Sequence, residues 1–142
     1  MTTVILYRVE RENGDGMYRP GGENDFSSPF NDVIDEWIEH SGEDRKTYCA
    51  AHCKIHMIPQ DDPNLSFLFW GPTGRYYHFA FASSEQLNHW IYRHEWKIGL
   101  RLKGYAVSIY SVDKEFCKHG DTQSVFMKSN ARLIDRVDLM EF

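Results

Sequence analysis

The sequence predicts one α+β domain, built from a curved or split, mainly antiparallel sheet and two or three helices. The chain has 142 residues, about the length of a single domain with one sizeable core. Strand-like segments stand near both ends of the chain, and segments with apolar residues at helical spacing stand between them. No repeat or linker interrupts residues 1–142, so a single globular domain is expected.

The composition argues against several classes of protein. Hydrophobic residues make up 42% of the chain, which is too apolar for a disordered protein. The formal net charge of −5 argues against direct binding to nucleic acid. No apolar run approaches the roughly 20 residues of a membrane span, and no signal peptide follows Met1. The three cysteines form no disulfide framework, so we expect reduced thiols and a cytoplasmic location.

The first half of the chain begins with a strand. Val4–Arg11 is rich in β-branched and aromatic residues, and the glycines of Asn13–Gly22 predict a loop after it. A Ser-Ser-Pro run can open a helix over Phe30–Ile38, where apolar residues recur at helical spacing, and Ser41–Asp44 ends that helix. Lys46–Ile58 is ambiguous between helix and strand and ends at a turn.

The middle of the chain predicts a hairpin and a helix. Leu65–Trp70 and Arg75–Phe81 are two strand candidates joined by Gly-Pro-Thr-Gly, which has the chemistry of a hairpin turn. Ser83 or Ser84 then caps a helix that reaches about His94.

Three further strands complete the expected sheet. They are Tyr105–Val112, Gln123–Lys128 and Ala131–Leu139, with a turn at "HGDTQ" between the first two.

The segment "CAAHCKIH" raises the question of a metal site. Cys49, His52, Cys53 and His56 fall on one face of a helix, and four ligands on one short helix cannot converge on a zinc ion without help from another element. The alternative is a core helix with small cysteines and partly buried histidines. We therefore predict no metal, with zinc as the minority interpretation. Some pairing of cysteine with histidine is unavoidable in this chain and identifies no nucleophile.

Two acidic segments, "DEWIEHSGED" and "DRVDLMEF", allow a structural and a functional interpretation. Such segments are usually solvated faces. An acidic surface can also imitate the phosphates of nucleic acid and occupy a basic groove on another protein.

Five polar residues from separate segments predict a cleft. Arg8 lies inside the first strand, Tyr18 lies in the glycine-rich loop, and Gln123 opens a late strand. Ser83 and Ser84 stand at a strand-to-helix junction, where free backbone amides favour anions. We predict that these residues line one concave surface that could bind a nucleotide.

Arg8 also has an alternative role. Leu6 and Arg8 point to one side of the strand and Tyr7 and Val9 to the other, so the strand is expected to be covered on both faces. A buried guanidinium needs an acidic partner or an open cleft. The competing hypothesis is therefore a structural ion pair with Glu10 or another carboxylate.

Several short motifs carry a resemblance to a known family. The order "LYRVE", "GDGMYR", "FAFASSEQLNHWI" and "QSVFMKSNARLI" resembles a family of small phage and prophage proteins, over most of the chain. More remotely, the layout is similar to the ADP-ribosyltransferase fold. That resemblance implies that Arg8 would meet NAD and that Ser83 or Ser84 would be the hydroxyl of the second motif. Gln123 stands where that fold usually places a catalytic Glu, so either another acid such as Asp121 supplies the charge or the fold serves as a binding module.

Two functions follow from these patterns. In the first, a phage-derived accessory protein binds and blocks a host protein and inhibits antiviral defence; Gln123 and the acidic segments favour it. In the second, an NAD-dependent ADP-ribosyltransferase modifies a host protein or nucleic acid. Arg8 and the aromatic share of 15%, which suits stacking on a nicotinamide or adenine ring, favour the second. We predict the binding protein first and the enzyme as its alternative.

Overall fold

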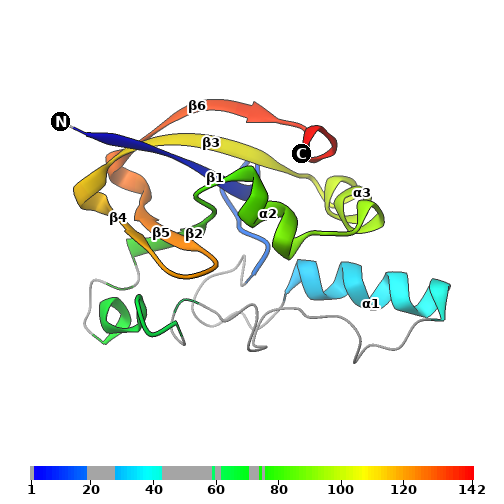
Figure 1. The fold of residues 1–142 in the computed structure, drawn as a ribbon. Coiled ribbons are helices and arrows are strands. Elements are labelled where there is room, and N and C mark those ends of the chain that lie inside the picture. The colour runs from blue at the N-terminus through cyan, green and yellow to red at the C-terminus, as the bar shows by residue number, and fades with distance from the viewer. Residues whose placement is uncertain (1, 19–27, 43–58, 60–61, 71–73, 75) are drawn as a thin grey trace.

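Two three-stranded antiparallel sheets form the centre of the protein (Figure 1). The computed structural model describes residues 2–18, 28–42, 59, 62–70, 74 and 76–142. In the first sheet, β3 (Tyr105–Asp113) lies between β1 (Thr3–Arg11) and β6 (Ala131–Val137). The register between β3 and β6 shifts between Ile109 and Tyr110 of β3. This shift marks a β-bulge in the edge strand β6.

The second sheet has β5 (Ser124–Met127) between β2 (Tyr77–Ala80) and β4 (Cys117–His119). The two sheets meet where Tyr7 and Phe81 exchange backbone hydrogen bonds of 2.8 and 2.7 Å. This junction confirms the predicted α+β class with a split antiparallel sheet.

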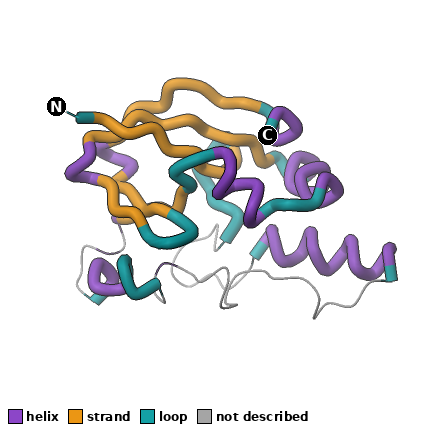
Figure 2. Tube along the Cα trace, in the orientation of Figure 1, coloured by secondary structure: helices purple, strands orange, loops and turns teal. Residues whose placement is uncertain are grey.

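Three α-helices occur in the described part of the chain (Figure 2). They are α1 (Pro29–Ser41), α2 (Ser84–Trp90) and α3 (His94–Leu102). Ser28 caps α1 and accepts from the amide of Asn31, while Ser83 caps α2 and accepts from the amide of Gln86. The predicted helix over Phe30–Ile38 and the predicted serine cap are therefore confirmed.

Four short 3₁₀ helices lie wholly within the described residues: η3 (Ser66–Phe69), η5 (Lys114–Phe116), η6 (Lys128–Asn130) and η7 (Leu139–Glu141).

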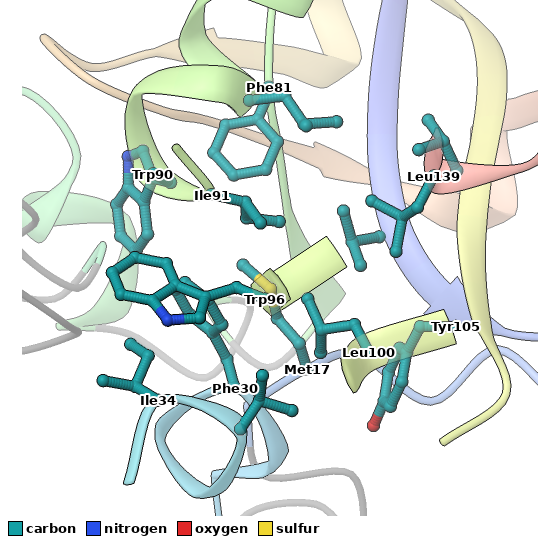
Figure 3. Close-up of a cluster of buried hydrophobic side chains, with 14 residues drawn as sticks. Met17, Phe30, Ile34, Phe81, Trp90, Ile91, Trp96, Leu100, Tyr105 and Leu139 are labelled. Carbon is teal, nitrogen blue, oxygen red and sulfur yellow. The ribbon is translucent and has the colours of Figure 1, made fainter. Parts of the chain in front are cut away.

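The larger core cluster is rich in aromatic side chains (Figure 3). Trp90 and Trp96 are almost completely buried, and their rings meet neighbouring aromatic rings mainly edge to face. A smaller cluster fills the space between the two sheets; its buried members are Leu6, Ala80, Tyr110, Val112, Cys117 and Phe126. Both faces of β1 are consequently covered, as its sequence predicts.

The predicted hairpin of Leu65–Trp70 with Arg75–Phe81 is wrong. Ser66–Phe69 is the 3₁₀ helix η3, and β2 pairs with β5 instead. The side chain of Asp62 accepts from the amide of Asn64, and its carbonyl accepts from the amides of Leu65 and Ser66. These bonds start a helical turn before a strand can begin.

The predicted helix from Ser83 to His94 is also wrong in its length. It ends at Trp90, and a second helix, α3, begins at His94 after the extended residue Arg93. Gly99 in the middle of α3 lowers helix propensity and obscured it in the sequence. A glycine is required there because a Cβ would lie 2.6 Å from a methyl carbon of Val33 in α1.

The remaining strand predictions agree closely with the structure, except at β6, which ends at Val137. The following residues form η7, in which Leu139 is buried.

Candidate functional site

Arg8 lies at the centre of a buried polar network. The residue is only 7% exposed. Its Nε donates to Glu10 Oε2 at 2.7 Å, its Nη1 to the carbonyl of Phe79 at 2.8 Å, and its Nη2 to the carbonyl of Gly14 at 3.4 Å. The structural ion pair with Glu10, the competing hypothesis for Arg8, is therefore confirmed.

Glu10 binds two further donors from distant segments. The phenol of Tyr110 in β3 donates to Oε1, and Lys128 Nζ in η6 lies 2.8 Å from Oε2. Burial raises the pKa of the Glu10 carboxyl, but the hydrogen bonds from Lys128, Tyr110 and Ser108 and the charge of Arg8 outweigh burial and leave this pKa below its ordinary value. We call Arg8, Glu10, Tyr110 and Lys128 the Arg8 network.

Two glycines let the loop after β1 approach this network. Gly14 has a φ of 94°, and its carbonyl accepts from both Arg8 and Lys128. A Cβ at Gly16 would lie 2.8 Å from Nη2 of Arg8. The network consequently connects the first sheet, the second sheet and the glycine loop. Arg8 therefore has a structural role.

His78 makes stability depend on pH, because its half-buried ring lies in the field of this network. Burial, and then the charges of Arg8 and Lys128, lower the pKa of His78 to about 4, and Glu10 opposes them. The unfolded chain binds a proton near the ordinary pKa of 6.5, so the folded state loses stability as pH falls below 6.5 toward 4. Urea unfolding between pH 7 and pH 4 should show this loss, and His78→Gln should flatten the slope.

The exposed His94 provides the control for this pH dependence. His94→Gln should leave the slope unchanged. A slope in His78→Gln equal to that of the wild type would contradict the role of His78. The depressed pKa of Glu10 adds a second loss of stability, which begins only below about pH 4.5.

The other predicted cleft residues belong to three different segments of the chain. The ring of Tyr18 packs 6.1 Å from that of Phe79, whose carbonyl binds Arg8. Ser83 uses its hydroxyl to cap α2, Ser84 is exposed, and Gln123 is fully buried.

The three hydrogen bonds of Arg8 go to Glu10, Phe79 and Gly14. A common ligand cleft of Arg8, Tyr18, the two serines and Gln123 therefore stays a prediction.

One cysteine–histidine pair lies in the second sheet. Cys117 Sγ is 3.8 Å from Nε2 of His119, and Nδ1 of His119 is 2.7 Å from the hydroxyl of Ser124. Burial raises the pKa of the Cys117 thiol to about 11, so the thiolate needed for nucleophilic attack is disfavoured. This arrangement supports packing better than catalysis.

The Cys/His set of Cys49, His52, Cys53 and His56 lies outside the described residues, as does the ambiguous segment Lys46–Ile58. Within the residues that the structure does describe, no three His, Cys, Asp or Glu side chains come together as a metal site.

The outer face of α1 carries a continuous row of carboxylates. Asp32, Asp35, Glu36 and Glu39 follow each other at the spacing i, i+3, i+4 and i+7, which places them on one side of the helix. All four residues are exposed, and they point away from the buried Val33 and Ile34 side of α1. We call these four residues the acidic stripe; Asp35, Glu36 and Glu39 belong to the acidic segment that the sequence singled out, and Asp32 precedes it.

Exposed apolar side chains mark surfaces that the sequence did not reveal. Trp70 and Leu102 are each 83% exposed, and Ile98 is 39% exposed one turn before Leu102 in α3. The period of apolar residues could not identify them, because an exposed and a buried apolar residue look alike in a sequence until the helix and its neighbours are known.

The fold and the site define a small α+β protein with a structural internal cation and an acidic helix on its surface. The model of the family described as Bacteriophage T4 Y00F protein matches residues 1–140, and the chain belongs to this phage family. Neither a curated protein nor a solved structure matches the chain. None of the helices in the described ranges is long and apolar enough to cross a bilayer.

Proposed function

We propose that this phage protein binds and blocks a host protein of antiviral defence in the host cytoplasm, by placing the acidic stripe in a basic, nucleic-acid-binding groove. The observation that carries the proposal is the regular row of four exposed carboxylates on α1. The net charge of −5 and the membership of a phage family support it.

The spacing of the stripe is close to that of nucleic acid. Asp32 and Glu39 are seven residues apart, which is about 10 Å along a helix that rises about 1.5 Å per residue. Four carboxylates over this length give on average one per about 3.5 Å of helix axis, and one strand of DNA carries a phosphate per about 3.4 Å of its own axis. One of the four, Glu36, also forms an ion pair with Lys103. A groove that accepts a phosphate backbone could therefore accept α1.

The Arg8 network favours this function over an NAD-dependent ADP-ribosyltransferase. An enzyme of that kind would need Arg8 to meet the dinucleotide, whereas Arg8 binds Glu10, Phe79 and Gly14. The location of Arg8 on the first strand and of Ser83 at a strand-to-helix junction supports the enzyme as the second candidate. Transfer of label from NAD to a host protein, lost in Ser83→Ala, would favour it.

The test neutralises the stripe at nearly constant size. A variant with Asp32→Asn, Asp35→Asn, Glu36→Gln and Glu39→Gln should bind the host protein about thirtyfold more weakly than the wild type, since four charges at roughly 0.5 kcal/mol each amount to about 2 kcal/mol. The measurement is capture from host lysate, followed by titration of the captured protein. Affinity of the wild type should fall with added salt.

A charge-matched variant provides the control. It neutralises exposed carboxylates elsewhere, by the substitutions Glu12→Gln, Glu85→Gln, Glu115→Gln and Asp135→Asn. This control should bind like the wild type. Equal weakening in both variants would mean that only the net charge matters, and the proposed role of α1 would fall.

A further inference from the structure

The strand β6 forms an open edge of the first sheet. In the described part of the chain β6 pairs with β3 alone, and its other side lies at the margin of the molecule (Figure 1). Residues 132–135 of this strand are all exposed. The amides and carbonyls along such an edge can pair with a further strand, and β6 contains neither proline nor lysine, which often prevent this pairing. The edge is therefore suited to bind another extended strand.

The β-bulge changes which side chains of β6 share a face. Side chains alternate along a regular strand, so Arg132 and Asp135, three residues apart, would point to opposite faces. In β6, however, Arg132 pairs with Ser111 and Asp135 pairs with Ile109, and these two residues of β3 are two apart and share a face. Ile134 is the extra residue in the bulge. Arg132 and Asp135 consequently carry opposite charges on the same exposed face.

These charges make β6 complementary to a second copy of itself. When two copies of β6 pair antiparallel with Leu133 opposite its counterpart, the next position on either side places Arg132 of each copy opposite Asp135 of the other. The position after that places Ala131 opposite Arg136, so no like charges face each other. Opposite charges directly across two strands stabilise their pairing, and like charges destabilise it.

The same charges disfavour the neighbouring registers. A twofold axis perpendicular to the sheet keeps every side chain on its own face, so the residue at the axis lies opposite its own copy. An axis at Arg132 would place two guanidinium groups opposite each other, and an axis at Asp135 would do the same with two carboxylates. The register centred on Leu133 avoids both contacts and brings together two apolar side chains that are each 53% exposed in the single chain.

We propose that the protein forms a symmetric dimer in which the β6 strands of two copies pair antiparallel, centred on Leu133. The dimer joins two three-stranded sheets into one continuous sheet. An interface of this kind, with the same surface on both copies, is the commonest form of homo-oligomer. The helix α1 lies at the opposite margin of the molecule from β6 (Figure 1), so the dimer leaves both acidic stripes uncovered. The inference does not depend on the proposed function.

Reversal of single charges tests the dimer and its register. The measurement is sedimentation velocity of the full chain over a range of concentrations, in which the wild type should show a monomer–dimer equilibrium. Arg132→Asp and Asp135→Arg each turn both ion pairs into like-charge pairs, so each should weaken the dimer about thirtyfold. An equimolar mixture of these two variants should dimerise again, because one is then acidic and the other basic at both positions.

Two further variants complete the test. Lys118→Asp is the matched control, because it changes the net charge as Arg132→Asp does and reverses an exposed cation on β4, an edge strand of the second sheet. This variant should dimerise like the wild type. Arg132→Gln removes the two ion pairs without adding repulsion and should weaken the dimer about fivefold. Thermal melts confirm that each variant is folded.

Several outcomes would overturn the inference. A wild type that stays monomeric would leave the edge of β6 to a strand of another protein. A dimer that survives both single reversals would have to use a different surface. Loss of the dimer in Lys118→Asp, or an equimolar mixture that stays monomeric, would contradict the pairing of β6 with its own copy in this register.

Discussion

Replacing Glu10 with alanine is expected to lower the free energy of unfolding by about 3–5 kcal/mol, because breaking a buried ion pair leaves uncompensated charge inside the protein. Glu10 binds Arg8, Tyr110 and Lys128 at once, and its side chain is only 4% exposed. Without it, the guanidinium of Arg8 keeps two carbonyl partners and no anion. Equilibrium unfolding in urea measures the change.

Two further variants provide reference values for the loss of stability in Glu10→Ala. Glu12→Ala removes an exposed carboxylate two residues along and should change the free energy of unfolding by no more than about 0.5 kcal/mol. Lys128→Met should fall between the two, because the side chain of Lys128 is 27% exposed and partly solvated. A loss in Glu10→Ala no larger than in Glu12→Ala would show that the Arg8 network does not support the fold.

Trp90→Ala is expected to destabilise the protein by about 3–5 kcal/mol, the usual cost of removing a large aromatic side chain from a packed core. The ring of Trp90 lies 5.1 Å from that of Phe79 and 5.8 Å from that of Phe81, and its Nε1 donates to the carbonyl of Thr122 at 3.1 Å. The substitution removes the packing of α2 on the sheet together with this hydrogen bond. The shift of the urea midpoint gives the magnitude.

Trp70→Ala is the matched control for this prediction. Trp70 is 83% exposed and Trp90 is 1% exposed, so the same chemical change should cost at most about 0.5 kcal/mol at Trp70. Similar losses at the two positions would contradict the assignment of Trp90 to the core.

The local sequence pattern predicts a helix or strand correctly where the tertiary contacts of the segment favour the same structure. The β-branched and aromatic residues of Val4–Arg11 and the helical spacing in Phe30–Ile38 identified β1 and α1, because the rest of the fold buries apolar side chains of both segments. The same reasoning failed for Leu65–Trp70, where Asp62 sets a helical turn through bonds that alternation does not encode. It also missed α3, where packing against α1 requires Gly99.

Only the contact between residues close together in the sequence could be predicted for the Arg8 network. The pairing of Arg8 with Glu10 follows from their separation of two residues in a strand, which places both side chains on one face. Tyr110 and Lys128 are about a hundred residues away along the chain, so only the folded sheets bring them to Glu10. The acidic stripe is visible in the sequence as a helix pattern, whereas the exposure of Leu102 depends on tertiary packing.

The most direct test of the proposed function is a competition between α1 and DNA for the captured host protein. A labelled duplex is bound to that protein, and this phage protein is added at increasing concentration. We predict full displacement of the duplex by the wild type and none, over the same range, by the variant with a neutralised acidic stripe. A stable ternary complex, in which the host protein holds the duplex and the phage protein together, would contradict the occupation of a nucleic-acid-binding groove by α1.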